Sequence, residues 1–217
     1  MNFEQARFNM VEQQIRPWEV LDFSVLDLLM SIRREEFVPE AYKSVALSEA
    51  PIPLGHGASM LVPVIEGKVL QAIQVKGSDK VLEVGAGSGY FAALLAAKAE
   101  WVRTVEIEPA LVNMAHDNLK RYGVENVIVE EGDAVSGWAG NAPYDLIVVS
   151  GAVPHVPESL LAQVKVGGRL FAFVGGPTLQ VATLIQVVGE GQYRTEKVFE
   201  TQVPMMRNAP RKNQFQF

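Results

Sequence analysis

The sequence predicts an α/β fold, in which a mainly parallel β-sheet is covered by helices and closed by an antiparallel C-terminal hairpin. Apolar strand-like segments alternate with helix-like segments after Gly77, a pattern typical of parallel sheets. A glycine-rich turn joins the first of these strands to its helix. Two β-rich runs near the C-terminus are joined by the turn residues 189–192, which indicates a hairpin.

The composition is that of a globular protein. The chain has 217 residues, of which 48% are hydrophobic and 20% charged, and this length suits one large α/β domain. A net charge of −6 argues against a nucleic-acid partner bound through a broad basic surface. The absence of cysteine excludes disulfides and thiolate metal sites. His56, His116 and His155 lack metal-ligand spacing, so no metal is expected.

The N-terminal residues mix polar and acidic side chains and lack the basic start and apolar stretch of a signal peptide. No apolar run approaches the roughly 20 residues that a membrane-spanning helix needs. We therefore expect a cytoplasmic protein without a membrane partner. The sequence leaves the oligomeric state open.

The first third of the chain is predicted to be mainly helical. Asp22 suits a helix N-cap, and apolar residues follow it at helical spacing as far as Ile32. Pro39 interrupts this pattern, and a loop rich in proline and glycine covers 50–57. Helical spacing of the apolar residues returns over 62–73.

Strands and helices alternate from residue 77 onward. The expected strands are the runs 80–87, 101–108, 126–133, 144–151 and 167–175. The expected helices cover 90–99, 109–123 and 157–164, and the second of these begins at Pro109 and ends at Gly123. Residues 77–217 are thus expected to form a ligand-binding core, with 1–76 as a helical extension and substrate loop of the same domain.

The turn after the first predicted strand, in VLEVGAGSGY, has glycines at positions 85, 87 and 89. Glycine is needed where the chain turns tightly and backbone amides approach a ligand. A dinucleotide fingerprint expects a further glycine where this chain has Tyr90, so NAD and FAD are disfavoured. The Walker pattern is also absent, because no Lys-Ser or Lys-Thr pair follows.

Three acidic residues lie at the ends of successive predicted strands. Glu83 precedes the turn, and the form E-x-G-x-G-x-G resembles the S-adenosylmethionine signature. Glu106 is placed to accept hydrogen bonds from both ribose hydroxyls, and Asp133 to reach the adenine amino group. We therefore predict an S-adenosyl-L-methionine site formed by Met60, Glu83, Gly85, Ala86, Gly87, Gly89, Glu106, Ile107, Asp133 and Ala134.

Nearly the whole chain, from about Ile15 to Met205, resembles the protein-L-isoaspartate O-methyltransferases. The motifs that carry the resemblance are RREEFVPEAY, PLGHGASMLVP, VLEVGAGSGY, GDAVSGW and the long run from APYDLIVVSG to GGRLFAFVG. The resemblance implies a Rossmann-like class I methyltransferase sheet. It also implies methyl transfer from S-adenosylmethionine to the carboxylate of isoaspartyl residues in damaged proteins, which starts their repair.

This chemistry requires positioning more than acid–base catalysis. A carboxylate with a pKa near 4 is already ionised at neutral pH, and the sulfonium supplies an activated methyl group. The site must therefore align oxygen, carbon and sulfur in a pocket shielded from water.

The loop GHGASMLVP departs from the family pattern G-x-G-Q-T-I-S-x-P. When Gly55, Gly57 and Pro63 are aligned, Leu61 stands where the family has a serine thought to assist at the substrate carboxylate. Residues two apart on an extended segment point the same way, so Ser59 is the candidate catalytic residue. The alternatives are a different substrate pose, or weak or lost isoaspartyl activity.

Two histidines are further candidates for the substrate site. His56 lies between the loop glycines and His155 follows the fourth predicted core strand, although both also suit ordinary loop positions. The late motif VPMMRNAP also departs from the family. Two other functions stay open: a methyltransferase of the same fold with another acceptor, and a non-catalytic cofactor-binding protein.

Overall fold

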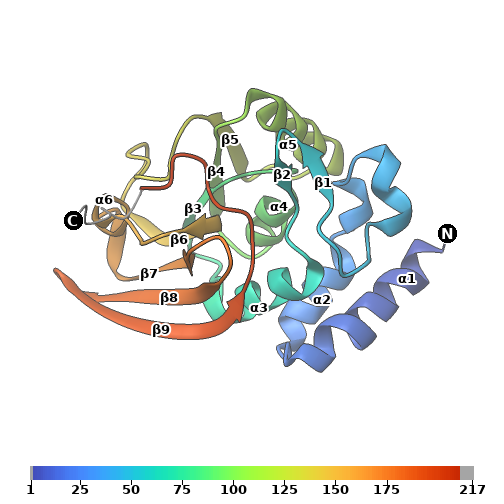
Figure 1. Cartoon of the computed structure of the whole chain (residues 1–217), viewed down its shortest axis with the longest axis horizontal. Coiled ribbons are helices and arrows are strands. Elements are labelled where there is room, and N and C mark those ends of the chain that lie inside the picture. Colours follow the sequence, from blue (N-terminus) through green and yellow to red (C-terminus); the bar gives the residue numbers. More distant parts are fainter. Residues whose placement is uncertain (1, 211–217) are drawn as a thin grey trace.

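The computed structural model describes residues 2–210. A seven-stranded sheet runs through the molecule, with its strands in the order β5-β4-β3-β6-β7-β8-β9 (Figure 1). The strands are β3 Lys80–Val84, β4 Trp101–Glu106, β5 Val127–Glu131, β6 Tyr144–Val153, β7 Val164–Gly175, β8 Gln180–Gly189 and β9 Gln192–Thr201. The first five in spatial order are parallel, and β8 and β9 pair antiparallel. The predicted parallel sheet with an antiparallel C-terminal hairpin is confirmed.

Helical elements precede the sheet, as predicted. They are α1 Phe3–Asn9, a π-helical turn Met10–Ile15, α2 Phe23–Ser31, α3 Pro63–Ile73 and three 3₁₀ turns, Arg16–Trp18, Arg34–Glu36 and Glu40–Val45. Asp22 caps α2, because its carboxylate accepts the N–H of Ser24 at 2.8 Å. The predicted loop before α3 contains a short hairpin, β1 Pro53–Gly55 and β2 Ala58–Ser59.

Three helices connect the parallel strands: α4 Tyr90–Ala96, α5 Pro109–Tyr122 and α6 Glu158–Leu161. Gly123 ends α5 in the left-handed conformation, with φ 83°. The helix predicted over 157–164 is shorter than expected. Val164 already pairs with Tyr144 in the sheet, and the carbonyl of Gln163 accepts the N–H of Tyr144 at 2.8 Å. Strand pairing therefore ends this helix early.

Two hydrophobic clusters lie on the two faces of the sheet. Along β6, Leu146 and Val148 belong to one cluster, and Ile147 and Val149 to the other, as the alternation of side chains along a strand requires. The first cluster joins the N-terminal helices to α3, α4 and α5 and includes Leu29 of α2. Within residues 2–210, no helix is both long and apolar enough to span a membrane.

Candidate active site

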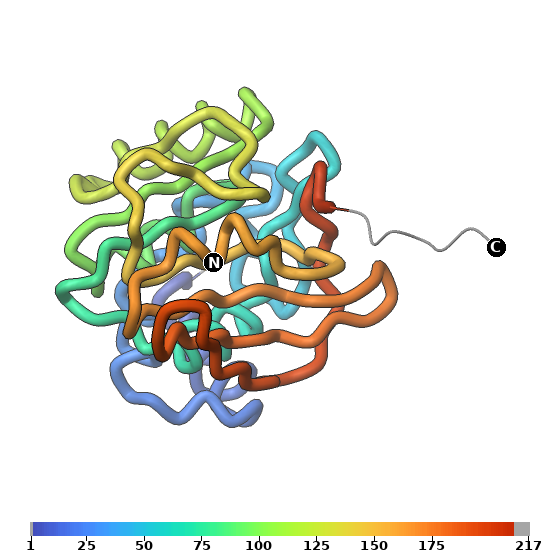
Figure 2. Tube along the Cα trace, turned by 90° about the vertical axis from the view of Figure 1, so that its left-hand side faces the viewer, coloured from blue at the N-terminus to red at the C-terminus, as the bar shows by residue number. Residues whose placement is uncertain are grey.

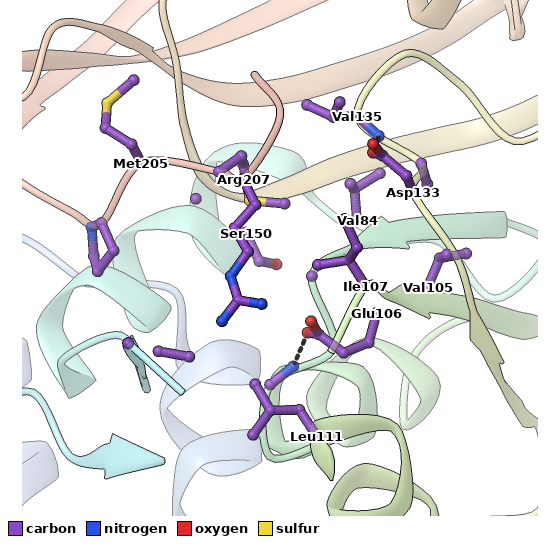
Figure 3. A pocket seen from close by; sticks show the side chains of 18 of the residues that line it. Val84, Val105, Glu106, Ile107, Leu111, Asp133, Val135, Ser150, Met205 and Arg207 are labelled. Carbon is purple, nitrogen blue, oxygen red and sulfur yellow. Dashed lines mark hydrogen bonds between the residues drawn. The ribbon is translucent and has the colours of Figure 1, made fainter. Parts of the chain in front are cut away.

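A crevice opens at the edge of the sheet where the parallel strands end. Because β5, β4, β3 and β6 are parallel neighbours, the residues after their carboxyl ends meet there. Counted out to its open mouth, with the solvent space included, the crevice encloses about 780 Å³. Six of the predicted cofactor residues line it: Gly85, Gly87, Glu106, Ile107, Asp133 and Ala134. Figure 3 labels Glu106, Ile107 and Asp133 among them.

The glycine turn after β3 forms one wall of the crevice. Gly87 has φ 52°, and its N–H donates to Oε2 of Glu106 at 3.0 Å. A Cβ at Gly87 would lie 3.3 Å from Cδ1 of Leu54 in the β1–β2 hairpin, so glycine keeps this approach open. Gly89 lies outside the crevice, and a Cβ there would lie 3.1 Å from the carbonyl oxygen of Ala115. Gly89 therefore allows α4 to pack closely against α5.

Two carboxylates face the crevice from neighbouring strand ends. The oxygens of Glu106 accept the N–H groups of Gly87 and Glu108 at 3.0 and 3.1 Å. The Oδ2 atom of Asp133 accepts Nδ2–H of Asn208 at 2.9 Å. Each carboxylate offers about four lone-pair sites, so both residues retain acceptor capacity for the hydroxyl or amino groups of a ligand.

Glu83 lies beneath the crevice and is fully buried. It borders a small adjoining cavity together with Met60 and Ala86. Its carboxyl oxygens accept hydrogen bonds from Thr104 Oγ1 at 2.7 Å and Ser150 Oγ at 3.0 Å. Burial raises the pKa of Glu83 to about 8, although the two hydroxyl hydrogen bonds favour the charged form. Glu83 thus orients Ser150, a residue that lines the crevice (Figure 3).

The buried Glu83 carboxyl leads to a prediction about stability and pH. Because its pKa is raised in the folded state to about 8, the folded protein binds more protons than the unfolded chain between pH 5 and 8, and stability falls as pH rises through this window. Glu83→Gln is expected to flatten this decline by about 1–4 kcal/mol, since each pKa unit corresponds to about 1.4 kcal/mol. Urea unfolding at pH 5 and pH 8 measures both slopes. Identical slopes in the wild type and the variant would show that Glu83 is charged in the folded protein.

Besides the small cavity at Glu83, a mostly apolar cavity adjoins the crevice, and we call it the second cavity. Ser59, Pro204 and Met205 line both spaces. Leu61 lines only the second of them, and its carbonyl oxygen accepts Nη2–H of the buried Arg34 at 2.7 Å. Ser59 therefore places a hydroxyl-bearing residue at the junction of the two cavities, whereas Leu61 contributes apolar surface.

The segment after β9 runs beside the β1–β2 hairpin (Figure 2), and its residues 204–207 line the crevice. It is joined to β6 by two backbone hydrogen bonds of 2.8 Å, from Ala152 N–H to the Pro204 carbonyl and from Met206 N–H to the Ala152 carbonyl. A Cβ at Gly151 would lie only 2.6 Å from the sulfur of Met206. Glycine at this position thus lets Met206 lie against the end of β6.

Several crevice-lining residues were not predicted from the sequence, among them the four residues Ser150, Met205, Met206 and Arg207. Ser150 carried a usable signal, because it is a polar residue at the end of an apolar strand. The other three belong to the motif VPMMRNAP, and its predicted departure from the family pattern was the available signal. Its position over the crevice depends on the path of the chain after β9.

The two candidate histidines lie in different places. His56 is at the tip of the β1–β2 hairpin, where its Nδ1 is 3.4 Å from Oε1 of Glu108 and its carbonyl accepts a hydrogen bond from Arg207. His155 follows β6 and lines neither the crevice nor the second cavity. In the described part of the chain, no group of three or more His, Cys, Asp or Glu side chains is arranged to hold a metal ion.

Comparison with known proteins identifies the family. The model of the protein-L-isoaspartate(D-aspartate) O-methyltransferases matches residues 5–209. The chain belongs to this family. It is therefore a methyltransferase, as the sequence motifs predicted.

Individual relatives of the isoaspartate methyltransferase family agree with this assignment. Protein-L-isoaspartate O-methyltransferase 1 of Rhodopseudomonas palustris is 43% identical over 174 residues, which cover 80% of this chain and 71% of the relative. Protein-L-isoaspartate O-methyltransferase 1 of Syntrophobacter fumaroxidans is 38% identical over 195 residues, which cover 90% of this chain and 91% of the relative.

Solved structures confirm the Rossmann-like methyltransferase fold. One protein-L-isoaspartate O-methyltransferase superposes with a TM-score of 0.80 at 25% identity, over 95% of this chain and 66% of the other. A putative family member from Plasmodium falciparum gives a TM-score of 0.79 at 18% identity, over 95% and 99% of the two chains. That protein was solved in complex with S-adenosyl-L-homocysteine.

Proposed function

We propose that this methyltransferase transfers a methyl group from S-adenosyl-L-methionine to the carboxylate of isoaspartyl residues in damaged proteins, and so acts in protein repair. The junction at Ser59 is the observation that carries the proposal, because the crevice to which we assign the cofactor meets there a second cavity, to which we assign the acceptor. Family membership over residues 5–209 supports the same reaction.

The residues of the crevice fit the cofactor. When bound, S-adenosyl-L-methionine supplies an electrophilic methyl group on a sulfonium. Glu106, fixed by two backbone N–H groups, would hold the ribose hydroxyls, and Asp133 would accept from the adenine amino group. Gly85 and Gly87 present no Cβ on the wall of the crevice. Ile107 and Ala134, which also line it, offer apolar surface to the adenine ring.

Ser59 is the residue that we assign to the acceptor carboxylate. It lines the crevice and both cavities beside it, and its hydroxyl can donate a hydrogen bond, which Leu61 cannot. The bond from Arg34 to the carbonyl of Leu61 fixes the backbone next to it. We therefore favour a hydroxyl that has moved two positions along the loop over a lost activity.

A matched pair of peptides tests the proposed function. The purified protein is incubated with radiolabelled S-adenosyl-L-methionine and an isoaspartyl peptide or its aspartyl counterpart. Faster labelling of the isoaspartyl peptide is the expected result. Equal labelling of both peptides, or none, would refute isoaspartyl specificity.

The assignment of Ser59 gives a prediction of its own. Ser59→Ala is expected to lower isoaspartyl kcat/KM by about 10- to 100-fold, because a hydrogen bond to a charged group is worth about 1.5–3 kcal/mol. Leu61→Ser is expected to raise it if the substrate lies as in the family. Ser48→Ala is a control, because Ser48 lines none of the three cavities and its hydroxyl bonds only the Val45 carbonyl. An unchanged isoaspartyl kcat/KM in Ser59→Ala would show that another group donates to the acceptor carboxylate.

One observation favours a second acceptor class. The second cavity has no charged lining residue and is bordered largely by apolar side chains: Pro51, Leu61, Val62, Ile65, Val203 and Met205. Such walls suit a small carboxylic acid with an apolar body. Methylation of such acids in a screen, without methylation of isoaspartyl peptide, would support this alternative.

We also propose that residues 1–76 and 77–217 belong to one domain, because one hydrophobic cluster contains residues of both. The cytoplasmic location and the absence of a nucleic-acid partner stay predictions from the sequence.

A further inference from the structure

Arg207 lies at the mouth of the crevice. The backbone hydrogen bonds between β6 and the segment after β9 fix the preceding residue, Met206, so the path of the chain places the Arg207 side chain over the opening (Figure 3). Its side chain is 46% exposed, so the guanidinium remains accessible to a ligand that enters from solvent.

The charges around Arg207 are mainly acidic. Glu106 and Asp133 line the crevice, and Glu83 and Glu66 line the small cavity beside it, where burial raises the pKa of Glu83 to about 8 and so keeps it mostly uncharged at pH 7. Glu66 is already paired with the buried Arg34. Among the described residues that line the crevice and the two adjoining cavities, Arg207 is the single cation. A ligand carboxylate that enters this space therefore has one cationic side chain on its walls to meet.

The present partners of Arg207 are exchangeable. Nη1 donates to Oε2 of Glu108 at 2.9 Å, and Nη2 donates to the carbonyl of His56. The pKa of Glu108 lies below its ordinary value, first because of this hydrogen bond from Arg207. The Glu108 side chain is 20% exposed and that of Arg207 46%, so water screens the pair in part, and a guanidinium has five N–H donors. Replacing Glu108 by a ligand carboxylate as the partner of Arg207 therefore costs little free energy.

We propose that Arg207 binds a carboxylate of the incoming ligand and is a specificity-determining residue of the reaction. This assignment rests on the proposed function, because both the isoaspartyl acceptor and the methionine part of the donor carry a carboxylate. The planar guanidinium matches a carboxylate through two parallel hydrogen bonds. In the absence of ligand, Glu108 occupies this place.

The test uses two substitutions with opposite expected effects. Arg207→Gln removes the cation and is expected to weaken carboxylate binding about tenfold. Glu108→Gln removes the competing anion and is expected to strengthen it about threefold. If the pair served only to hold the C-terminal segment in place, both substitutions would change binding in the same direction. Arg207→Lys, which keeps the charge but loses the planar fork, should restore part of the binding.

Two measurements distinguish the source of the carboxylate. Calorimetry compares S-adenosyl-L-homocysteine with 5′-methylthioadenosine, which lacks the amino-acid part. A loss confined to S-adenosyl-L-homocysteine in Arg207→Gln assigns the donor carboxylate. A rise in KM for the isoaspartyl peptide, at unchanged kcat and unchanged cofactor affinity, assigns the acceptor carboxylate. Either result supports the proposal.

Arg16→Gln is the matched control, because Arg16 has the same 46% side-chain exposure and forms an ion pair of 2.9 Å with Glu12 outside the crevice. The proposal is overturned if Arg207→Gln equals this control in both measurements, or if Glu108→Gln and Arg207→Gln shift binding in the same direction. If the wild type labels no isoaspartyl peptide, the proposed function fails, and calorimetry still decides the role of Arg207. If the wild type bound neither S-adenosyl-L-homocysteine nor 5′-methylthioadenosine, both the proposed function and the role of Arg207 would be overturned.

Discussion

Arg34→Ala is expected to lower the free energy of unfolding by about 3–5 kcal/mol, the cost of breaking a buried ion pair on one side. Arg34 is completely buried and pairs with Glu66, which is 2% exposed. It also donates hydrogen bonds to the carbonyls of Ala46 at 2.9 Å and Leu61 at 2.7 Å. Its removal leaves a buried carboxyl and two carbonyls without their donor. Urea unfolding at pH 7 measures the loss.

The neighbouring residue provides a control for this variant. Arg33 is exposed, and its closest carboxylate, that of Glu36, lies 3.9 Å away, so Arg33→Ala should change stability by less than about 0.5 kcal/mol. Combining Arg34→Met with Glu66→Leu should recover much of the loss, because an apolar pair needs no compensating charge. Equal stability of Arg34→Ala and Arg33→Ala would contradict the buried ion pair.

Glu106→Ala is expected to reduce affinity for S-adenosyl-L-homocysteine by about 10- to 100-fold, corresponding to about 1–3 kcal/mol. The substitution removes the carboxylate proposed for the ribose hydroxyls. It also frees the N–H groups of Gly87 and Glu108, which Glu106 holds in place. Titration calorimetry gives the affinity directly. Asp133→Ala should show a loss of similar size through the adenine amino group.

Glu131→Ala is the matched control for Glu106→Ala. Glu131 is the residue paired with Glu106 across β4 and β5, yet it is exposed and lies outside the crevice. Its removal should leave affinity unchanged. If Glu106→Ala and Asp133→Ala also bound S-adenosyl-L-homocysteine like the wild type, the cofactor site would have to lie elsewhere.

Local signals were sufficient to predict most secondary structure. Asp22 caps α2 and Gly123 ends α5 because these side chains and backbone angles act within one turn of the chain. The short hairpin before α3 and the early end of α6 were not predicted. Both depend on strand pairing. The sequence around Val164 does not reveal that this residue pairs with Tyr144, so local signals could not predict the pairing.

In the candidate site too, some residues could be placed from the sequence and others only from the structure. Glu106 and Asp133 could be placed from the sequence, because each closely follows or ends a strand and parallel strands end at one edge of the sheet. Glu83 shows where this reasoning falls short. Its position next to the turn indicated a cofactor residue, but its side chain points into the core and bonds Thr104 and Ser150. Side-chain direction on a strand was the deciding factor.

The sequence by itself determined the α/β class, the glycine turn and the family, and it predicts that Leu61 stands in place of the family serine. These properties reside in residue order and short spacings, which need no folded coordinates. Only the tertiary structure decided that Ser59 stands where two cavities meet and that Arg207 lies over the crevice. Such contacts join segments about 150 residues apart, as the Arg207 bond to the His56 carbonyl illustrates, and their geometry arises only when the sheet, the hairpin and the C-terminal segment pack together.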